Sequence, residues 1–103
     1  MAKEPERTPD GRYIVIGGRR WRATDPAIPA EVQSQLRSLL MRARRAVKQA
    51  LHDEDPAAEK RARAQVQTAK VALGERGDPW WDQTDQERER RWTDGVQQLT
   101  ETE

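Results

Sequence analysis

The residue types best suited to metal or acid–base chemistry gather at one point of the chain. His52, the single histidine, is followed directly by Asp53, Glu54 and Asp55. Imidazole and carboxylate groups bind divalent cations, so a metal site is one interpretation. The other is a junction between two helices, where a histidine suits the negative end of one helix dipole and acids suit the positive end of the next. We favour the junction and predict no metal and no cofactor.

The sequence contains few residues or motifs for other kinds of catalysis. The chain has no cysteine, which excludes thiolate nucleophiles, zinc–thiolate sites and disulfides. It also has no phosphate-binding loop, dinucleotide fingerprint, HExxH motif or GxSxG motif. The segment Gly17-Gly18-Arg19-Arg20 resembles a phosphate-cradling loop only superficially, because it does not join a strand to a helix. We therefore predict that the protein is not an enzyme.

Basic side chains dominate the first half of the chain and indicate a nucleic-acid surface as one candidate function. Nine basic and two acidic residues lie between positions 12 and 48. Arginine and lysine neutralise phosphates, and an aromatic ring among them can stack on a base. The candidate residues are Tyr13, Arg19, Arg20, Arg22, Arg42, Arg44, Arg45 and Lys48. The alternative interpretation is a set of solvated charges on a helix surface.

Tryptophan supports a second candidate function, binding of a protein partner. The chain has four tryptophans and one tyrosine but no phenylalanine. Exposed tryptophan near arginine is typical of interface hot spots. The candidate residues are Trp81 and Trp92. A non-enzymatic binding or adaptor protein is our leading hypothesis, and weak, sequence-independent nucleic-acid or ribosome binding is the alternative.

A β-hairpin over residues 12–23 is predicted to position the first of these side chains. Gly17 and Gly18 tolerate the positive φ angles of a two-residue turn, which pairs Tyr13 with Arg22. One face of this hairpin should be buried against helices and the other exposed. The expected buried set is Ile14, Ile16, Trp21 and Ala23, and the exposed set is Tyr13, Val15, Arg20 and Arg22.

Two helices are predicted to follow, over residues 30–52 and 55–73. Apolar residues recur at spacings of three and four along the first helix, which is typical of one buried stripe. Asp55 is a good N-cap for the second helix, and Gly74 supplies its left-handed stop. Because the connection is short, the two helices should pack antiparallel.

The turn over residues 74–82 contains two adjacent tryptophans. Neighbouring residues of an extended segment point in opposite directions. We therefore expect Trp80 to be directed inward and Trp81 to be the more exposed of the two.

Residues 83–103 are predicted to form an acidic tail that is partly helical or mobile. Eight acidic and three basic side chains lie between positions 78 and 103. The pattern Thr84-x-x-Glu87 is a helix capping box. Such a tail would compete for the basic surface of the first half. Residues 1–11 are polar, with two prolines and a glycine, and are predicted to be a disordered leader.

Together these elements predict one small α+β domain over residues 12–82. An N-terminal two-stranded hairpin packs on an antiparallel helical hairpin, with a tryptophan-containing turn and a weak C-terminal helix or tail. Charged residues make up 36% of the 103 residues, against about 25% in typical chains, so the core should be small. No apolar run approaches the roughly 18 residues of a membrane span, and the N-terminus lacks the apolar segment of a signal peptide. We therefore expect a cytoplasmic location.

Three blocks of sequence carry a resemblance to other proteins. They are GRRWRATDPAIP at 18–29, LMRARRAV at 40–47 and AKVALGERGDPWW at 69–81. The chain resembles, over residues 12–82, a group of small uncharacterised proteins from high-GC Gram-positive bacteria that often carry the label "biopolymer transporter Tol". The resemblance assigns no activity, and it implies a cell-envelope-associated protein as a third interpretation. It also implies that residues 83–103 are a separate extension.

Overall fold

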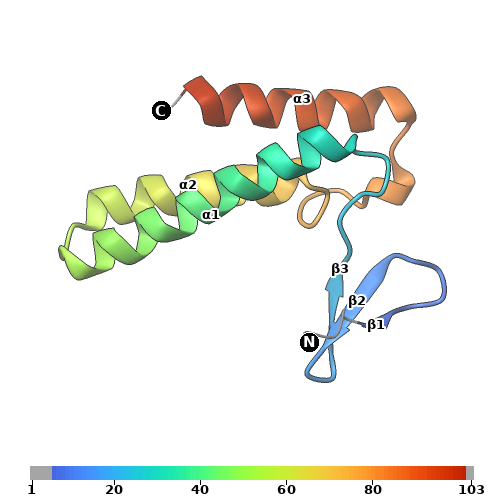
Figure 1. Cartoon of the computed structure of the whole chain (residues 1–103), viewed down its shortest axis with the longest axis horizontal. Helices are drawn as coiled ribbons and strands as arrows, with labels where there is room; N and C mark the ends of the chain where they lie inside the picture. The colour runs from blue at the N-terminus through green and yellow to red at the C-terminus, as the bar shows by residue number, and fades with distance from the viewer. Residues whose placement is uncertain (1–5, 102–103) are drawn as a thin grey trace.

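The chain forms a three-stranded antiparallel sheet followed by three helices, an α+β arrangement (Figure 1). The computed structural model describes residues 6–101. Its elements are β1 (Glu6–Arg7), β2 (Tyr13–Ile16), β3 (Arg19–Arg22), α1 (Ala30–His52), α2 (Pro56–Ala72), the 3-10 helix η1 (Trp80–Asp82) and α3 (Asp85–Glu101). The strands follow one another in space in the order β1, β2, β3.

The predicted hairpin and its register are confirmed. Gly17 and Gly18 both have positive φ angles, 59° and 76°, and Tyr13 lies opposite Arg22. Strand β1 was not expected. It lies within the predicted leader and pairs antiparallel with β2. The prediction of disorder is therefore wrong for this part of the leader, and its residues 1–5 lie outside the described residues.

The helical hairpin is also confirmed. Helix α1 has the predicted bounds, and α2 begins and ends one residue inside its prediction. The side chain of Asp55 accepts a hydrogen bond of 3.0 Å from the backbone N–H of Ala58, which is the expected N-cap. Gly74 follows the second helix with a φ of 80°. The two helices lie antiparallel, side by side (Figure 1).

The C-terminal segment, predicted to be a weak helix or a tail, forms helix α3. The hydroxyl of Thr84 accepts a hydrogen bond from the N–H of Glu87, and the Glu87 carboxylate accepts one from the N–H of Thr84, so the capping box starts the helix as expected. The helix then packs along α2 with Gly95 at the contact, where an added Cβ would clash with Ala72. Residues 85–101 are thus part of the domain rather than a separate extension.

The core closes among the three helices and Ile28. Its buried members are Ile28, Leu36, Leu39, Leu40, Ala69, Ala72, Leu73 and Leu99. The expectation that a hairpin face fills this core is wrong, because Ile16 is 51% exposed and Trp21 is 47% exposed. Leu99 of α3 belongs to the core instead. The sheet stands away from the helices and meets them at the end of β3 (Figure 1).

Candidate nucleic-acid interface

The tryptophan turn fastens the sheet to the helices. Trp80 is only 8% exposed, and its indole N–H donates a hydrogen bond of 3.0 Å to the carbonyl of Ala23, at the end of β3. A Cβ at Gly74 would lie 3.0 Å from the Cβ of Asp25, so only glycine suits this close approach. Trp81 is partly exposed, and the prediction that Trp80 is the inward residue is confirmed.

One face of the sheet carries a stack of aromatic and guanidinium groups. The rings of Tyr13 and Trp81 meet edge to face, with their centroids 5.5 Å apart. The guanidinium of Arg20 lies 4.6 Å from the Tyr13 ring centroid, while Arg12 and Arg22 lie 4.9 Å and 5.7 Å from that of Trp81. We call these five residues the stacked face. Arg22 is opposite Tyr13 in register, but Arg20 is the residue that covers the ring.

The opposite face of the sheet exposes a tryptophan. Arg7, Ile14 and Trp21 form a row across the three strands, because Arg7 pairs with Ile14 and Ile14 pairs with Trp21. The guanidinium of Arg19 lies 4.8 Å from the Trp21 ring centroid. Ile16 shares this face by strand alternation. We call these five residues the open face.

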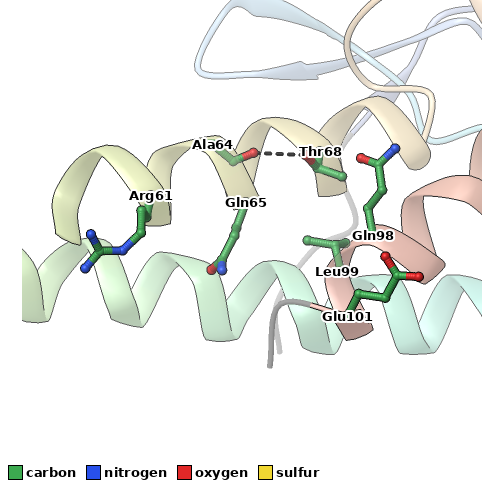
Figure 2. A pocket seen from close by; sticks show the side chains of 7 residues that line it. All are labelled: Arg61, Ala64, Gln65, Thr68, Gln98, Leu99 and Glu101. Carbon is green, nitrogen blue, oxygen red and sulfur yellow. Dashed lines mark hydrogen bonds between the residues drawn. The ribbon is translucent and has the colours of Figure 1, made fainter. Parts of the chain in front are cut away.

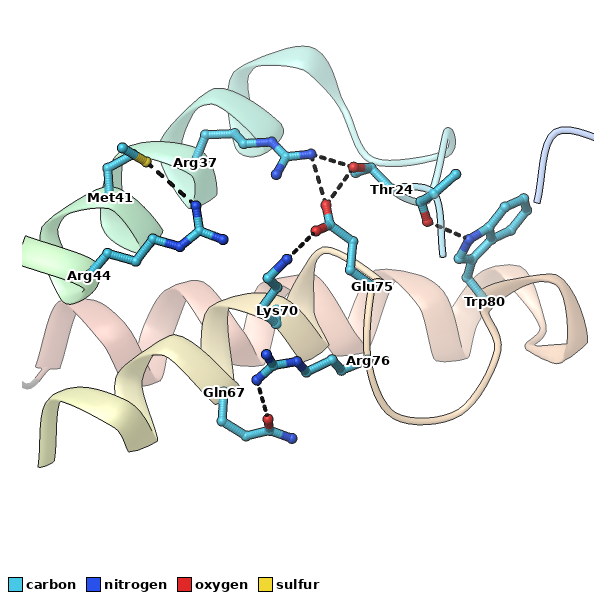
Figure 3. A network of polar contacts seen from close by, with 10 residues as sticks. Thr24, Arg37, Met41, Arg44, Gln67, Lys70, Glu75, Arg76 and Trp80 are labelled. Atoms are coloured by element: carbon cyan, nitrogen blue, oxygen red, sulfur yellow. Dashed lines mark hydrogen bonds and ion pairs between the residues drawn. The ribbon is translucent and has the colours of Figure 1, made fainter. Parts of the chain in front are cut away.

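A pocket lies between the sheet and the helices. It is lined by Arg7, Ile14, Arg22, Thr24, Arg37, Lys70 and Glu75. The Glu75 carboxylate accepts hydrogen bonds from the Thr24 hydroxyl at 2.6 Å, from Arg37 at 2.8 Å and from Lys70 at 3.0 Å (Figure 3). Burial raises the pKa of Glu75, but these donors outweigh it and hold the pKa below its usual value. We call this site the cationic pocket.

The predicted basic residues of α1 are exposed, but they do not share one side of the helix. At 100° per residue, Arg44 and Lys48 lie within a narrow stripe that includes Arg37 of the cationic pocket. Arg42 and Arg45 lie well off this stripe. Arg44 also lines a second hollow between α1 and α2. The other lining residues of that hollow are Val47, Arg63, Val66 and Arg76.

A buried ion cluster was missed by the sequence analysis. Asp25 is 0% exposed, and its carboxylate accepts hydrogen bonds from Arg88 and, at 2.5 Å, from Arg91. Burial raises the pKa of Asp25, but both arginines and the N–H of Ala27 lower it further than burial raises it. Arg91 also donates to the carbonyl of Ala72. Because solvent does not reach the Asp25 side chain, the cluster holds α3 in place rather than forming a reactive site.

Trp92, the other predicted protein-binding residue, is half-buried against the core. The guanidinium of Arg91 lies 5.8 Å from one of its rings. Trp92 therefore helps to pack α3 against the core. Its side chain is less exposed to a partner than that of Trp21.

A further pocket, of about 660 Å³, lies between α2 and α3 (Figure 2). It is lined by Arg61, Ala64, Gln65, Thr68, Gln98, Leu99 and Glu101. The Thr68 hydroxyl donates to the carbonyl of Ala64, so this polar group is already bonded. One arginine and one glutamate leave the pocket without a net charge that would select a ligand.

The junction at residues 52–55 behaves as a helix connection. Asp55 caps α2, and Asp53 accepts a hydrogen bond from Gln49. Within residues 6–101, no group of three or more histidine, aspartate or glutamate side chains is arranged to hold a metal ion. No helix in the same range has both the length and the apolar character needed to cross a bilayer. No family model, curated protein or solved structure matches this chain.

Proposed function

We propose that the protein binds single-stranded nucleic acid across its N-terminal sheet. The observation that carries this proposal is the pairing of arginine with aromatic rings on both faces: Arg20 with Tyr13, Arg12 with Trp81, and Arg19 with Trp21. Phosphates need cations and unpaired bases need flat rings, and this sheet presents both side by side.

The arginines of these pairs are available to an anion. Among residues 6–101, Arg12, Arg19 and Arg20 make no ion pair with a carboxylate, and all three are exposed. A guanidinium that lies over a ring keeps its five N–H donors in its own plane, directed to the sides. Those donors can take phosphate oxygens while the stack holds the group in position.

The exposed indole favours unpaired bases over a duplex. Trp21 is 47% exposed on a strand, and bases of single strands stack on such rings with little sequence preference. In a duplex the base faces are already stacked on their neighbours, so the indole has no partner there. The protein should therefore bind single strands more tightly than duplexes of equal length.

Fluorescence anisotropy with a labelled, mixed-sequence oligonucleotide tests this proposal. Trp21→Ala should weaken binding by about 1–3 kcal/mol, the range for one lost base stack. Met41→Ala is a matched control, because Met41 is 48% exposed on α1 and remote from the sheet. Arg19→Gln and Arg20→Gln should each lower the slope of log K against log salt by about one.

Two results would reject the proposal. One is an absence of binding at low salt in the unmodified protein. The other is an equal loss of affinity in Trp21→Ala and Met41→Ala. Tighter binding to duplexes than to single strands would mean that the protein binds nucleic acid through its charged side chains alone, without base stacking on its aromatic rings.

A protein partner is the second candidate function, and the open face favours it. Ile16 and Trp21 are both about half exposed on the same side of the hairpin, and tryptophan is enriched in interface hot spots. The tagged chain should then retain its partner from a lysate after nuclease treatment and lose it with Ile16→Ser. A partner that disappears with nuclease supports the nucleic-acid proposal instead.

A further inference from the structure

We propose that the cationic pocket binds the terminal phosphate group of the nucleic-acid strand. This inference rests on the proposed function for the identity of the ligand, but the pocket itself is defined by its own residues. Arg7, Arg22, Arg37 and Lys70 come from β1, β3, α1 and α2, so the site exists only in the folded chain.

The charge of the pocket suits a dianion. Four cationic side chains and one carboxylate, that of Glu75, line it, which leaves an excess of three positive charges. A terminal phosphate monoester carries about two negative charges at neutral pH, whereas a phosphate within the strand carries one. The pocket should therefore prefer the end of a strand that bears a phosphate.

Glu75 arranges two of the cations without consuming them. It accepts one hydrogen bond from Lys70 and one from Arg37, and both are held against the same carboxylate (Figure 3). An ammonium has three donors and a guanidinium has five, so each retains free donors for phosphate oxygens. Because the fold already fixes these groups, little side-chain entropy is lost when an anion arrives.

Arg22 and Arg7 complete the pocket from the sheet. Arg22 donates a hydrogen bond of 2.6 Å to the carbonyl of Gly77, which fixes its guanidinium beside the tryptophan turn. The Arg7 side chain has no hydrogen bond or ion pair with another described residue. The pocket volume of about 400 Å³ lies within the range of about 300–1,000 Å³ for ligand sites.

The register places this pocket at one end of the open face. Arg7, Ile14 and Trp21 are successive neighbours across the sheet, so the backbones of Arg7 and Trp21 lie roughly 10 Å apart. A terminal phosphate at Arg7 would direct the following nucleotides toward Trp21. The pocket therefore defines which end of the strand lies at the helices.

The test measures the affinity of the full chain for one oligonucleotide by fluorescence anisotropy. The oligonucleotide is used without a terminal phosphate, with a 5′ phosphate and with a 3′ phosphate. We expect one phosphorylated form to bind about tenfold more tightly than the unphosphorylated strand. Lys70→Gln should remove this difference. Lys60→Gln is the matched control, since Lys60 is an exposed lysine on the same helix outside the pocket, and it should retain the difference.

Arg7→Gln provides a second variant that leaves the Glu75 network untouched, and it too should remove the preference. Equal binding of phosphorylated and unphosphorylated strands would overturn this inference while the proposed function stands. A preference for the phosphorylated strand that persists in both Lys70→Gln and Arg7→Gln would also overturn this inference.

Inorganic phosphate tests the pocket even if no strand binds. In NMR titrations at constant ionic strength, phosphate should shift the backbone amides of Thr24, Lys70, Glu75 and Gly77 saturably, and sulfate should do so less. The shifts should disappear in Lys70→Gln and persist in Lys60→Gln. Saturable shifts without strand binding would support the pocket and reject the strand as its ligand, whereas small, linear shifts spread over the surface would overturn the pocket.

Discussion

Asp25 joins three parts of the chain through its side chain and its backbone. Its oxygens accept hydrogen bonds from Arg88 and Arg91 of α3, and its backbone N–H donates to the carbonyl of Leu73 at 3.0 Å. Arg88 also lies over Trp80, with 5.3 Å between its guanidinium carbon and the ring centroid. The segment leaving the sheet, the end of α2 and the start of α3 therefore meet at this one residue, through its carboxylate and its backbone N–H.

We predict that Asp25→Asn lowers the free energy of unfolding by about 3–5 kcal/mol, because it leaves two largely buried arginines without their counter-charge. Urea denaturation followed by circular dichroism measures the change. Asp94→Asn, at an exposed position of α3, should change the stability by less than about 0.5 kcal/mol. A loss below about 1 kcal/mol in Asp25→Asn would show that the cluster does not hold the helices together.

Stability should also fall in acid. The pKa values of Asp25 and Glu75 are held below their usual range, so the folded state favours their ionised forms. Their contribution is complete above the unfolded-state pKa values of about 3.9 and 4.3 and is lost as the pH falls through the lower folded-state values. Urea denaturation between pH 7 and pH 3 should show a decline beginning below about pH 4.5. Asp25→Asn should make this decline shallower, and an unchanged decline would exclude Asp25 as a cause.

At the scale of elements, the sequence predicts what depends on neighbours along the chain. The bounds of α1 follow from its apolar stripe, and the turn at Gly17-Gly18 follows from its glycines. The alternation of side chains along a strand divides the hairpin into two faces. It does not predict which face packs against a core, or whether either face does. For this reason the sequence predicts a buried Trp21, whereas the side chain is about half exposed. The partners of Asp25 lie 63 and 66 residues away, beyond any local pattern.

The close contact of α2 and α3 predicts a size limit at Gly95. Gly95→Ala adds a methyl group that clashes with Ala72, and the strain of about 1–3 kcal/mol should exceed the roughly 1 kcal/mol gained in helix propensity. The double variant with Ala72→Gly should show a favourable coupling energy in denaturation experiments. Thr93→Ala is the control on the exposed side of the helix. A Gly95→Ala protein as stable as the original would mean that the helices separate without cost.

At the scale of the whole molecule, the sheet and α3 lie on different sides of the α1–α2 hairpin (Figure 1). Helix α3 carries Leu99 into the core and supplies both arginines to Asp25. An acidic segment that masks the basic surface is thus not the arrangement seen for residues 85–101. The final helix is a structural part of the domain.

A chain that ends at Thr84 should therefore unfold rather than bind nucleic acid more strongly. Removal of α3 uncovers Ala72 and Leu73 and leaves Asp25 buried without a counter-charge. Circular dichroism should show loss of cooperative unfolding and of most helical signal. A folded, truncated chain with increased affinity would instead support competition by the acidic segment.

The turn at Gly17 and Gly18 lies at the far end of the hairpin from the helices, and a Cβ added to either glycine would have no atom within 4 Å. Exposed turns of this kind accept inserted sequence without disturbing a core. A small dye or epitope placed there would travel with the sheet and leave the helices as they are. The fold thus provides its own attachment point for a reporter, a short distance along the strand from Trp21.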